Sequence, residues 1–144
     1  MTVKYWTEEK APEQQFEKAH KEDAGYDIRS AEAAKLRGGA SHVFPTGLHV
    51  AIPEGYVGIL KSRSGNAVNK GLEVGAGVID SGYTGEVKVL MHNMSVASHR
   101  IAVGNKIAQM VIVPICDLES QQVSSLEELG ESERGADGFG STGR

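Results

Sequence analysis

The sequence has 144 residues, of which 40% are hydrophobic and 24% charged, and this composition is typical of one folded domain rather than of a disordered or fibrous chain. The net charge of −4 is unevenly distributed, because residues 117–144 carry seven acids and two bases whereas the residues before them carry 12 acids and 13 bases. Neither part is basic enough to predict binding to a nucleic-acid polymer. No apolar run approaches the roughly 18 residues of a membrane span, so we expect no membrane partner.

Two features bear on the cellular compartment. The first residues, Met1–Trp6, contain no apolar stretch of the kind that a signal peptide has. The single cysteine, Cys116, has no partner for an internal disulfide, which fits a reducing compartment. We therefore expect a cytoplasmic protein, or a nuclear one in a eukaryote.

Short runs of apolar and β-branched residues, separated by turns, dominate the chain. Residues 3–6 predict an edge strand, and residues 43–60 predict strands that are separated by a Pro-x-Gly turn. Residues 87–91 and 106–115 predict further strands, and the second of these is so continuously apolar that burial on both faces is expected. Helical pattern is scarce, with two turns of helix predicted over residues 64–70.

The chain has 18 glycines among 144 residues, against a usual share of about 7%, and they add turn positions between these strands. The pattern predicts an all-β fold, which is a sandwich, a barrel or a jelly roll. We expect residues 1–116 to form this core. Residues 117–144 are acidic and then glycine-rich, which is typical of a mobile C-terminal arm. Composition alone favours a disordered terminus over an arm that becomes ordered on a ligand.

A candidate anion site follows the strand that ends near residue 60. Its sequence is Lys61-Ser62-Arg63-Ser64-Gly65. A helix that begins at this point would direct backbone amides at an anion, and Arg63 can bind phosphate with two hydrogen bonds. An exposed basic turn is the competing interpretation.

A candidate hairpin covers residues 75–85, with its turn centred at Gly82-Tyr83. This register places Gly77 opposite Lys88 and leaves a strip without bulky side chains, where a ligand can reach the backbone. Asp80 stands just before the turn. It either caps the turn or acts as a carboxylate at the edge of a site, where it orients a sugar hydroxyl and deprotonates a water.

Residues 138–143 match the letters of a G-x-G-x-x-G motif, but they open no helix, which excludes a dinucleotide-binding fold. The glycine amides and Arg134 can still surround phosphates, and Phe139 lacks a local core and suits stacking on a base.

The sequence contains no strong pattern of metal ligands. The histidines and Cys116 have no zinc-ligand spacing, and the two acids of residues 23–27 are too few for a calcium loop.

Five segments, taken in order, resemble the five motifs of the trimeric dUTPase family. They are residues 24–30, 63–65, 77–85, 104–109 and 134–143. The resemblance implies a homotrimer of distorted β jelly rolls with a flexible C-terminal arm and active sites at the subunit boundaries. It also implies Mg²⁺-dependent hydrolysis of dUTP to dUMP and pyrophosphate, which limits uracil incorporation into DNA and supplies dUMP for thymidylate synthesis.

The resemblance further implies roles for single residues. Asp80 is similar to the residue that contacts the 3′-hydroxyl and activates the attacking water, and Tyr83 is similar to the ring that packs under deoxyribose. Gly77 and Lys88 match positions whose main chain binds uracil. Asp27 matches an acid that supports Mg²⁺ through water, the metal being held mainly by the triphosphate. The other expected substrate-binding residues are Arg63, Ser64, Gly65 and Gln109 at the phosphates, Val78 and Ile79 in the third motif, and Arg134, Phe139, Gly140, Ser141 and Thr142 in the arm that closes on the nucleotide.

Three positions depart from the commonest family pattern. Gly82 stands where an acid is frequent, Asn105-Lys106 stands where Asp-Arg is frequent, and Asp137 stands where a glycine is frequent. None of these positions is assigned direct chemistry by the resemblance. Asp137 adds negative charge near the phosphates, so we expect it to reduce the affinity of the arm.

Two other functions compete with this interpretation. A dCTP deaminase of the same fold would need a glutamate ten residues after Asp80, where this chain has Leu90 with Met91 beside it. A non-catalytic regulator that binds nucleotide or a protein would be marked by loss of Asp80 or of the arm, and both are present.

Overall fold

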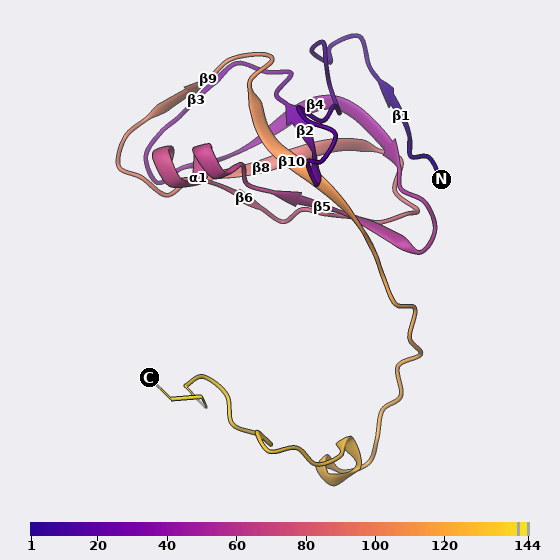
Figure 1. Ribbon diagram of the computed structural model, residues 1–144. Helices are drawn as coiled ribbons and strands as arrows, with labels where there is room; N and C mark the ends of the chain where they lie inside the picture. The colour runs from indigo at the N-terminus through magenta and orange to yellow at the C-terminus, as the bar shows by residue number, and fades with distance from the viewer. Residues whose placement is uncertain (141, 144) are drawn as a thin grey trace.

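The computed structural model describes residues 1–140 and 142–143, and its body is built mainly from β-strands (Figure 1). The strands are β1 (Lys4–Thr7), β2 (Gly25–Arg29), β3 (Ala34–Leu36), β4 (Ser41–Ala51), β5 (Tyr56–Lys61), β6 (Leu72–Gly75), β7 (Val78–Ile79), β8 (Glu86–Asn93), β9 (His99–Ile101) and β10 (Lys106–Pro114). A short helix, α1 (Ser64–Lys70), follows β5, and a 3-10 turn, η1 (Leu126–Leu129), lies near the C-terminus. The predicted all-β fold is confirmed. In the described part of the chain, no helix is long and apolar enough to cross a membrane.

Two four-stranded sheets and one two-stranded ribbon form the body. The first sheet has the order β1-β4-β8-β6, the second has the order β2-β10-β5-β7, and β3 pairs with β9 in the ribbon. Neighbouring strands are antiparallel throughout. Strands that are consecutive in the chain therefore belong to different sheets, as in a jelly roll.

The core lies where the inner faces of the two sheets meet. Along β8, burial alternates from residue to residue, and Val87, Val89 and Met91 are fully buried. Ile28 of β2 and Met110 of β10 are buried from the second sheet. Each such side chain contributes roughly 1.5–3 kcal/mol through removal of its apolar surface from water. The alternation leaves every second residue of β8 free to face the solvent or a ligand.

The predicted strands fall on β1, β4, β5, β8 and β10, and the predicted helix falls on α1. The expected burial of residues 106–115 on both faces is correct only for the first half of β10, where Ile107, Ala108 and Met110 are buried. Residues 111–113 are half-buried. The second half of β10 therefore presents a partly exposed apolar strip in the single chain.

The C-terminal segment leaves the body after β10 and carries η1 away from the sheets (Figure 1). Residues 117–140 are exposed apart from the half-buried Val123. The domain boundary at residue 116 and the mobility of this arm remain predictions.

Candidate active site

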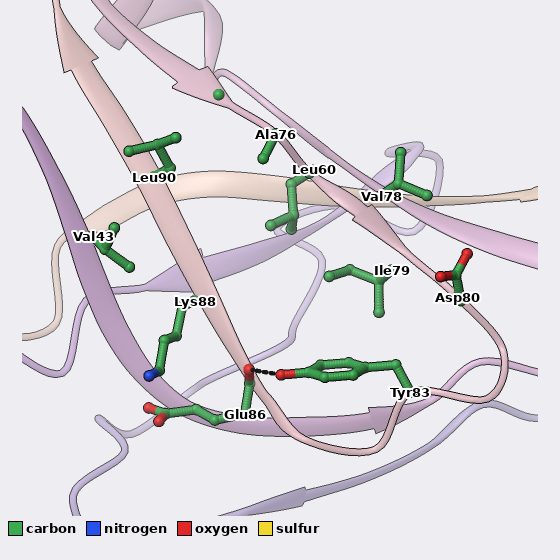
Figure 2. Close-up of a pocket in the computed structure, with 12 residues that line it drawn as sticks. Val43, Leu60, Ala76, Val78, Ile79, Asp80, Tyr83, Glu86, Lys88 and Leu90 are labelled. Carbon is green, nitrogen blue, oxygen red and sulfur yellow. Dashed lines mark hydrogen bonds between the residues drawn. The ribbon is translucent and has the colours of Figure 1, made fainter.

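A cavity of about 400 Å³ opens beside the turn between β7 and β8 (Figure 2). Six of the predicted site residues line it, namely Gly77, Val78, Ile79, Asp80, Tyr83 and Lys88. The rest of the lining comes from Val43, Leu60, Gly75, Ala76, Glu86 and Leu90. The cavity thus combines apolar side chains with a few charged and polar groups, as small-molecule sites commonly do.

The cavity exists because a hairpin splays open. β6 pairs with β8 as far as Gly75 and Leu90, which is the register of the predicted hairpin, but the pairing does not extend to Gly77 and Lys88. The pairing stops at Gly75, since the next two residues, Ala76 and Gly77, have φ angles of 52° and 103°. These angles carry the chain to the other sheet, where β7 pairs with β5. The hairpin therefore straddles both sheets and leaves a gap between β7 and β8.

The backbone carbonyl of Gly77 takes part in a hydrogen bond within the fold. It accepts a hydrogen bond from the Leu60 N–H at 2.8 Å. A Cβ at residue 77 would lie 2.9 Å from the Leu60 carbonyl oxygen, so both the space and the positive φ require glycine. The Gly77 N–H has no hydrogen-bond partner among the residues that the structure describes. The Gly77 N–H is therefore free to donate to a ligand, and the second lone pair of its carbonyl oxygen can accept a further hydrogen bond.

Asp80 and Tyr83 lie on the turn at the edge of the cavity. The Tyr83 N–H donates to the Asp80 carbonyl at 3.1 Å, and the Tyr83 hydroxyl donates to the Glu86 carbonyl at 2.7 Å, which lays the ring across the turn (Figure 2). The Asp80 carboxylate is exposed, and within the described structure it makes no hydrogen bond or ion pair. It does not cap the turn, so it is free to act on a ligand.

Glu86 is a lining residue that sequence reasoning missed. Its carboxylate accepts hydrogen bonds from the N–H groups of Gly47 at 3.0 Å and Thr46 at 3.2 Å, and it pairs with Lys10 at 2.9 Å. Burial alone favours the neutral acid, but the Lys10 ammonium and the two amides outweigh it and lower the pKa of Glu86. The carboxylate is ionised and its Oε1 contacts all three partners, which suits a structural role better than proton transfer. No local signal could have found it, since its partners lie far away in the sequence.

A second group of predicted residues lies where β2, β10 and β5 run side by side. Gln109 of β10 pairs with Asp27 on one side and with Lys61 on the other. The Asp27 carboxylate forms ion pairs with Arg63 Nε at 3.4 Å and Lys106 Nζ at 2.9 Å. Two cations thus surround one carboxylate, and the excess positive charge suits an anionic ligand. Lys106 was not predicted, although its sequence signal was present in the fourth motif, where a cation is frequent.

The loop after β5 adds backbone groups to this cationic cluster. α1 begins at Ser64, as predicted, and Arg63 precedes it with an extended backbone. The Gln109 side-chain amide donates to the Ser62 carbonyl at 3.2 Å, which joins the loop to β10. A Cβ at Gly65 would meet none of the described residues within 4 Å, so the space beside this first turn of the helix is open in the part of the chain that the structure describes. None of these residues lines the cavity at the hairpin.

Asp27 is the residue that the sequence predicts beside a metal ion. Among the described residues, no three histidine, cysteine, aspartate or glutamate side chains come together to hold a metal ion. A divalent cation would therefore take most of its ligands from phosphate and water. Asp27 fits an outer role, because an ionised carboxylate has about four acceptor positions and its two ion pairs leave some of them for metal-bound water.

The predicted arm residues lie apart from both groups. The Arg134 guanidinium donates to two carbonyls of its own segment, at 2.7 and 3.0 Å. The Phe139 ring is fully exposed, and Gly140 and Thr142 are exposed as well, whereas Ser141 lies outside the described residues. None of them lines the cavity at the hairpin. One chain therefore presents the cavity, the cationic cluster and the arm as three separate parts.

These features define a class: an all-β protein with a small-molecule cavity at an open hairpin and a separate cationic cluster that suits anionic groups. A family model described as dUTPase matches residues 12–143. The deoxyuridine 5'-triphosphate nucleotidohydrolase of Candida albicans is 45% identical over 121 residues, which cover 84% of this chain and 76% of that protein. The corresponding enzyme of Leifsonia xyli subsp. xyli is 41% identical over 128 residues, which cover 87% of this chain and 82% of that protein.

Solved structures give the same result. The dUTPase of Staphylococcus bacteriophage 80alpha, solved with dUPNHPP, is similar to this chain with a TM-score of 0.89 and 37% identity, and the match covers 99% of each chain. A mutant dUTPase from phage phi11 of S. aureus, described as revealing the coordination of a structural Mg(II) ion, has a TM-score of 0.80 and 35% identity, covering 88% of this chain and 99% of that one. The chain belongs to the dUTPase family.

Proposed function

We propose that this chain hydrolyses dUTP to dUMP and pyrophosphate, with Asp80 activating the water that attacks the α-phosphorus. Membership of the dUTPase family supports the reaction. The observation that supports the role of Asp80 is its carboxylate at the edge of the cavity, which has no partner within the described structure. A carboxylate in such a position can orient a water and accept its proton. The activity belongs with the nucleotide pool in the cytoplasm or the nucleus, where it limits uracil in DNA and provides dUMP for thymidylate synthesis.

The cavity at the open hairpin is assigned to the deoxynucleoside. Uracil presents an N3 donor beside carbonyl acceptors, and the Gly77 N–H can donate to one of these, with Lys88 of β8 lining the same cavity. Cytosine has an acceptor at N3 and a donor at position 4, the reverse of uracil, so the buried protein groups that bind uracil would lose their hydrogen-bond partners. The Tyr83 ring, which lies across the turn, offers a flat surface for deoxyribose and limits the room for a 2′-hydroxyl.

The cationic cluster is assigned to the triphosphate. Arg63, Ser64, Gly65 and Gln109 lie at the start of α1 and beside it, with Lys106 adding a second positive charge through Asp27. Hydrolysis of a phosphoanhydride depends mainly on positioning and on neutralisation of charge. Mg²⁺ carried by the triphosphate would supply further neutralisation, and Asp27 would accept hydrogen bonds from its water ligands.

Complete sites are assigned to the boundaries of a homotrimer. A single chain leaves the cavity, the cationic cluster and the arm apart, so a neighbouring subunit is needed to join them. The half-buried strip of residues 111–113 is apolar surface that a neighbour can cover. The arm would then bring Arg134 to the phosphates and Phe139 to the base, and its closure would exclude water.

The competing functions are less well supported by the cavity. Leu90 lines it and Met91 is buried, so the positions of the strand where the deaminase would have its glutamate carry no carboxylate. Glu86, at the start of this strand, is held in its ionised form by Lys10 and by the Thr46 and Gly47 amides, which all contact its Oε1, so it is poorly suited to shuttle a proton. A purely regulatory protein has no need of an unpaired carboxylate at its nucleotide site.

The deciding experiment measures pyrophosphate release from dUTP, dTTP, dCTP and UTP, with and without Mg²⁺. We expect turnover of dUTP that requires the metal and is much faster than that of the other three nucleotides. Appreciable conversion of dCTP to dUTP or dUMP would favour the deaminase. Absence of turnover together with intact nucleotide binding would favour the regulator.

A further inference from the structure

The turn between β7 and β8 has few bonds of its own. Within the described structure, residues 80–85 make two hydrogen bonds through Tyr83, to the carbonyls of Asp80 and Glu86. Another element provides one further contact to the turn. Nδ1 of His49 lies 2.8 Å from the Thr84 carbonyl oxygen. His49 belongs to β4, which pairs with β8. The histidine is thus the point at which the sheet holds this turn.

Both ring nitrogens of His49 face hydrogen-bond acceptors. Nδ1 faces the Thr84 carbonyl, and Nε2 lies 3.2 Å from the Glu8 carboxylate. Neither acceptor can donate, so the ring makes both bonds only when both nitrogens carry a proton. The bond to Thr84, together with the nearby Glu8, raises the pKa of His49 above 6.5.

The charged groups that face His49 come from three elements. Glu8 and Lys10 follow β1, and Lys10 lies 3.7 Å from Glu8 and 2.9 Å from Glu86 at the start of β8. Lys4 of β1 lines an apolar hollow together with His49. Two carboxylates and two ammonium groups therefore surround one imidazole. The carboxylate of Glu8 is the one in direct contact with the ring, which favours its charged form.

We infer that His49 is a positioning residue for dUTP hydrolysis: doubly protonated, it ties Thr84 to β4 and so holds the turn that presents Asp80 and Tyr83 to the substrate. Lys10 secures the other end of the turn through Glu86. The inference rests on the proposed function of this turn. His49 does not line the cavity beside the turn, so it acts only through the position of the turn. Loss of one proton leaves a single N–H on the ring, so the Thr84 and Glu8 bonds can no longer be made together, and the turn is loosened to the extent that the remaining proton resides on Nε2.

The test uses full-length variants and a matched control. His49→Leu removes the donor to Thr84, His49→Asn places an amide N–H near the Nδ1 position without a titrating group, and Glu8→Gln removes the charge that favours the imidazolium. His42→Leu is the control, because His42 lies on the same strand and also contacts a glutamate, Glu32, but does not touch the turn. We measure kcat and KM for dUTP from about pH 6 to about pH 9, the range in which a histidine near a carboxylate titrates. NMR of the His49 ring nitrogens and hydrogen exchange of the turn amides are recorded in parallel.

For the wild type, kcat falls and the protection factors of the turn amides, which correct for the intrinsic rise of exchange with pH, decrease as pH increases through the pKa of His49. His49→Leu lowers kcat by up to about 100-fold, since small displacements of a catalytic group have such effects, and loses this pH dependence. His49→Asn keeps most of kcat but has a flat profile, Glu8→Gln moves the fall to lower pH, and His42→Leu behaves as the wild type.

The inference is overturned if His49→Leu keeps the kcat, the pH profile and the turn exchange of the wild type, or if NMR shows a singly protonated ring over this range. Failure of the proposed function is a separate result. If the wild type does not turn over dUTP, that function fails, while the exchange of the turn amides in the variants still decides whether His49 holds the turn.

Discussion

The Tyr83 hydroxyl occupies the space that a side chain at Gly85 would need, because a Cβ at residue 85 would lie 2.6 Å from that oxygen and 2.7 Å from Cζ. The ring can lie across the turn and reach the Glu86 carbonyl only while residue 85 is glycine. The absence of a side chain at one position of the turn therefore determines where the aromatic ring lies at another.

Gly85→Ala is expected to push the Tyr83 ring away from the turn. The ring is 44% exposed and can move into solvent, so the melting temperature should change little. We expect KM for dUTP to rise roughly five- to tenfold, which corresponds to about 1 kcal/mol of lost aromatic contact and hydrogen bonding. Gly82→Ala is the matched control, since a Cβ there would meet nothing within 4 Å. Equal KM values for the two variants would contradict the argument.

Asp80→Asn is expected to separate binding from chemistry. The amide keeps the size of the side chain but cannot accept the proton of a water, and loss of a general base typically lowers kcat by about 100- to 10,000-fold. Calorimetry with a non-hydrolysable dUTP analogue should give a Kd close to that of the wild type. Asp117→Asn, at an exposed position outside the site, should leave both quantities unchanged. A near-normal kcat for Asp80→Asn would refute its role as base.

Local pattern was sufficient to predict the hairpin register but not the gap within it. The turn at Gly82-Tyr83 determines which residues of a hairpin face each other, and the observed pairing of Gly75 with Leu90 agrees with it. The departure at Ala76 depends on β5, which offers β7 a partner in the other sheet. Whether residues after Gly75 pair with β8 or with β5 depends on how the two sheets pack, and this cannot be predicted from neighbouring residues in the sequence. β2, β3 and β9 were missed for a similar reason, because short strands acquire their burial from partners that are distant in the chain.

In the candidate site, too, some residues can be recognised from their neighbours in the sequence and others cannot. Asp80, Tyr83 and Arg63 stand in motifs that can be recognised from neighbouring residues. Glu86 and His49 belong to no motif, and their contacts with Gly47 and Thr84 join residues 39 and 35 positions apart. Sequence reasoning could identify the groups assigned to the substrate, but it could not identify the groups that hold them in place.

Glu86→Gln is expected to weaken the folded state in a pH-dependent way. The pKa of Glu86 is lowered from 4.5, so the ionised form stabilises the fold above that value, and this contribution is lost as pH falls through the lower, folded pKa. At neutral pH the variant should lose about 1 kcal/mol, since its hydrogen bonds to the Thr46 and Gly47 amides and to Lys10 are no longer charge-assisted. Thermal unfolding of both proteins over a pH series measures this, and the two melting curves should converge in acid. Glu119→Gln, at an exposed position, serves as the control, and a constant difference at all pH values would contradict the assignment.

Truncation after Ser132 is expected to leave a folded body with poor turnover. Among the described residues, Arg134 and its neighbours make hydrogen bonds only within their own segment, so the melting temperature should match that of the full chain. Activity with dUTP should fall on the order of 100-fold, because the arm would supply a cation for the phosphates and would exclude water on closing.

Phe139→Ala separates stacking from these other contributions of the arm. Stacking of a base on an aromatic ring is worth about 1–3 kcal/mol, so KM should rise roughly 5- to 150-fold while Arg134 still reaches the phosphates. The ring is fully exposed in the single chain, and its removal should therefore have no effect on stability. A truncated chain as active as the wild type would show that the arm has no part in the reaction. A normal KM for Phe139→Ala combined with an inactive truncation would instead assign the contribution of the arm to Arg134 and the glycine amides that follow it.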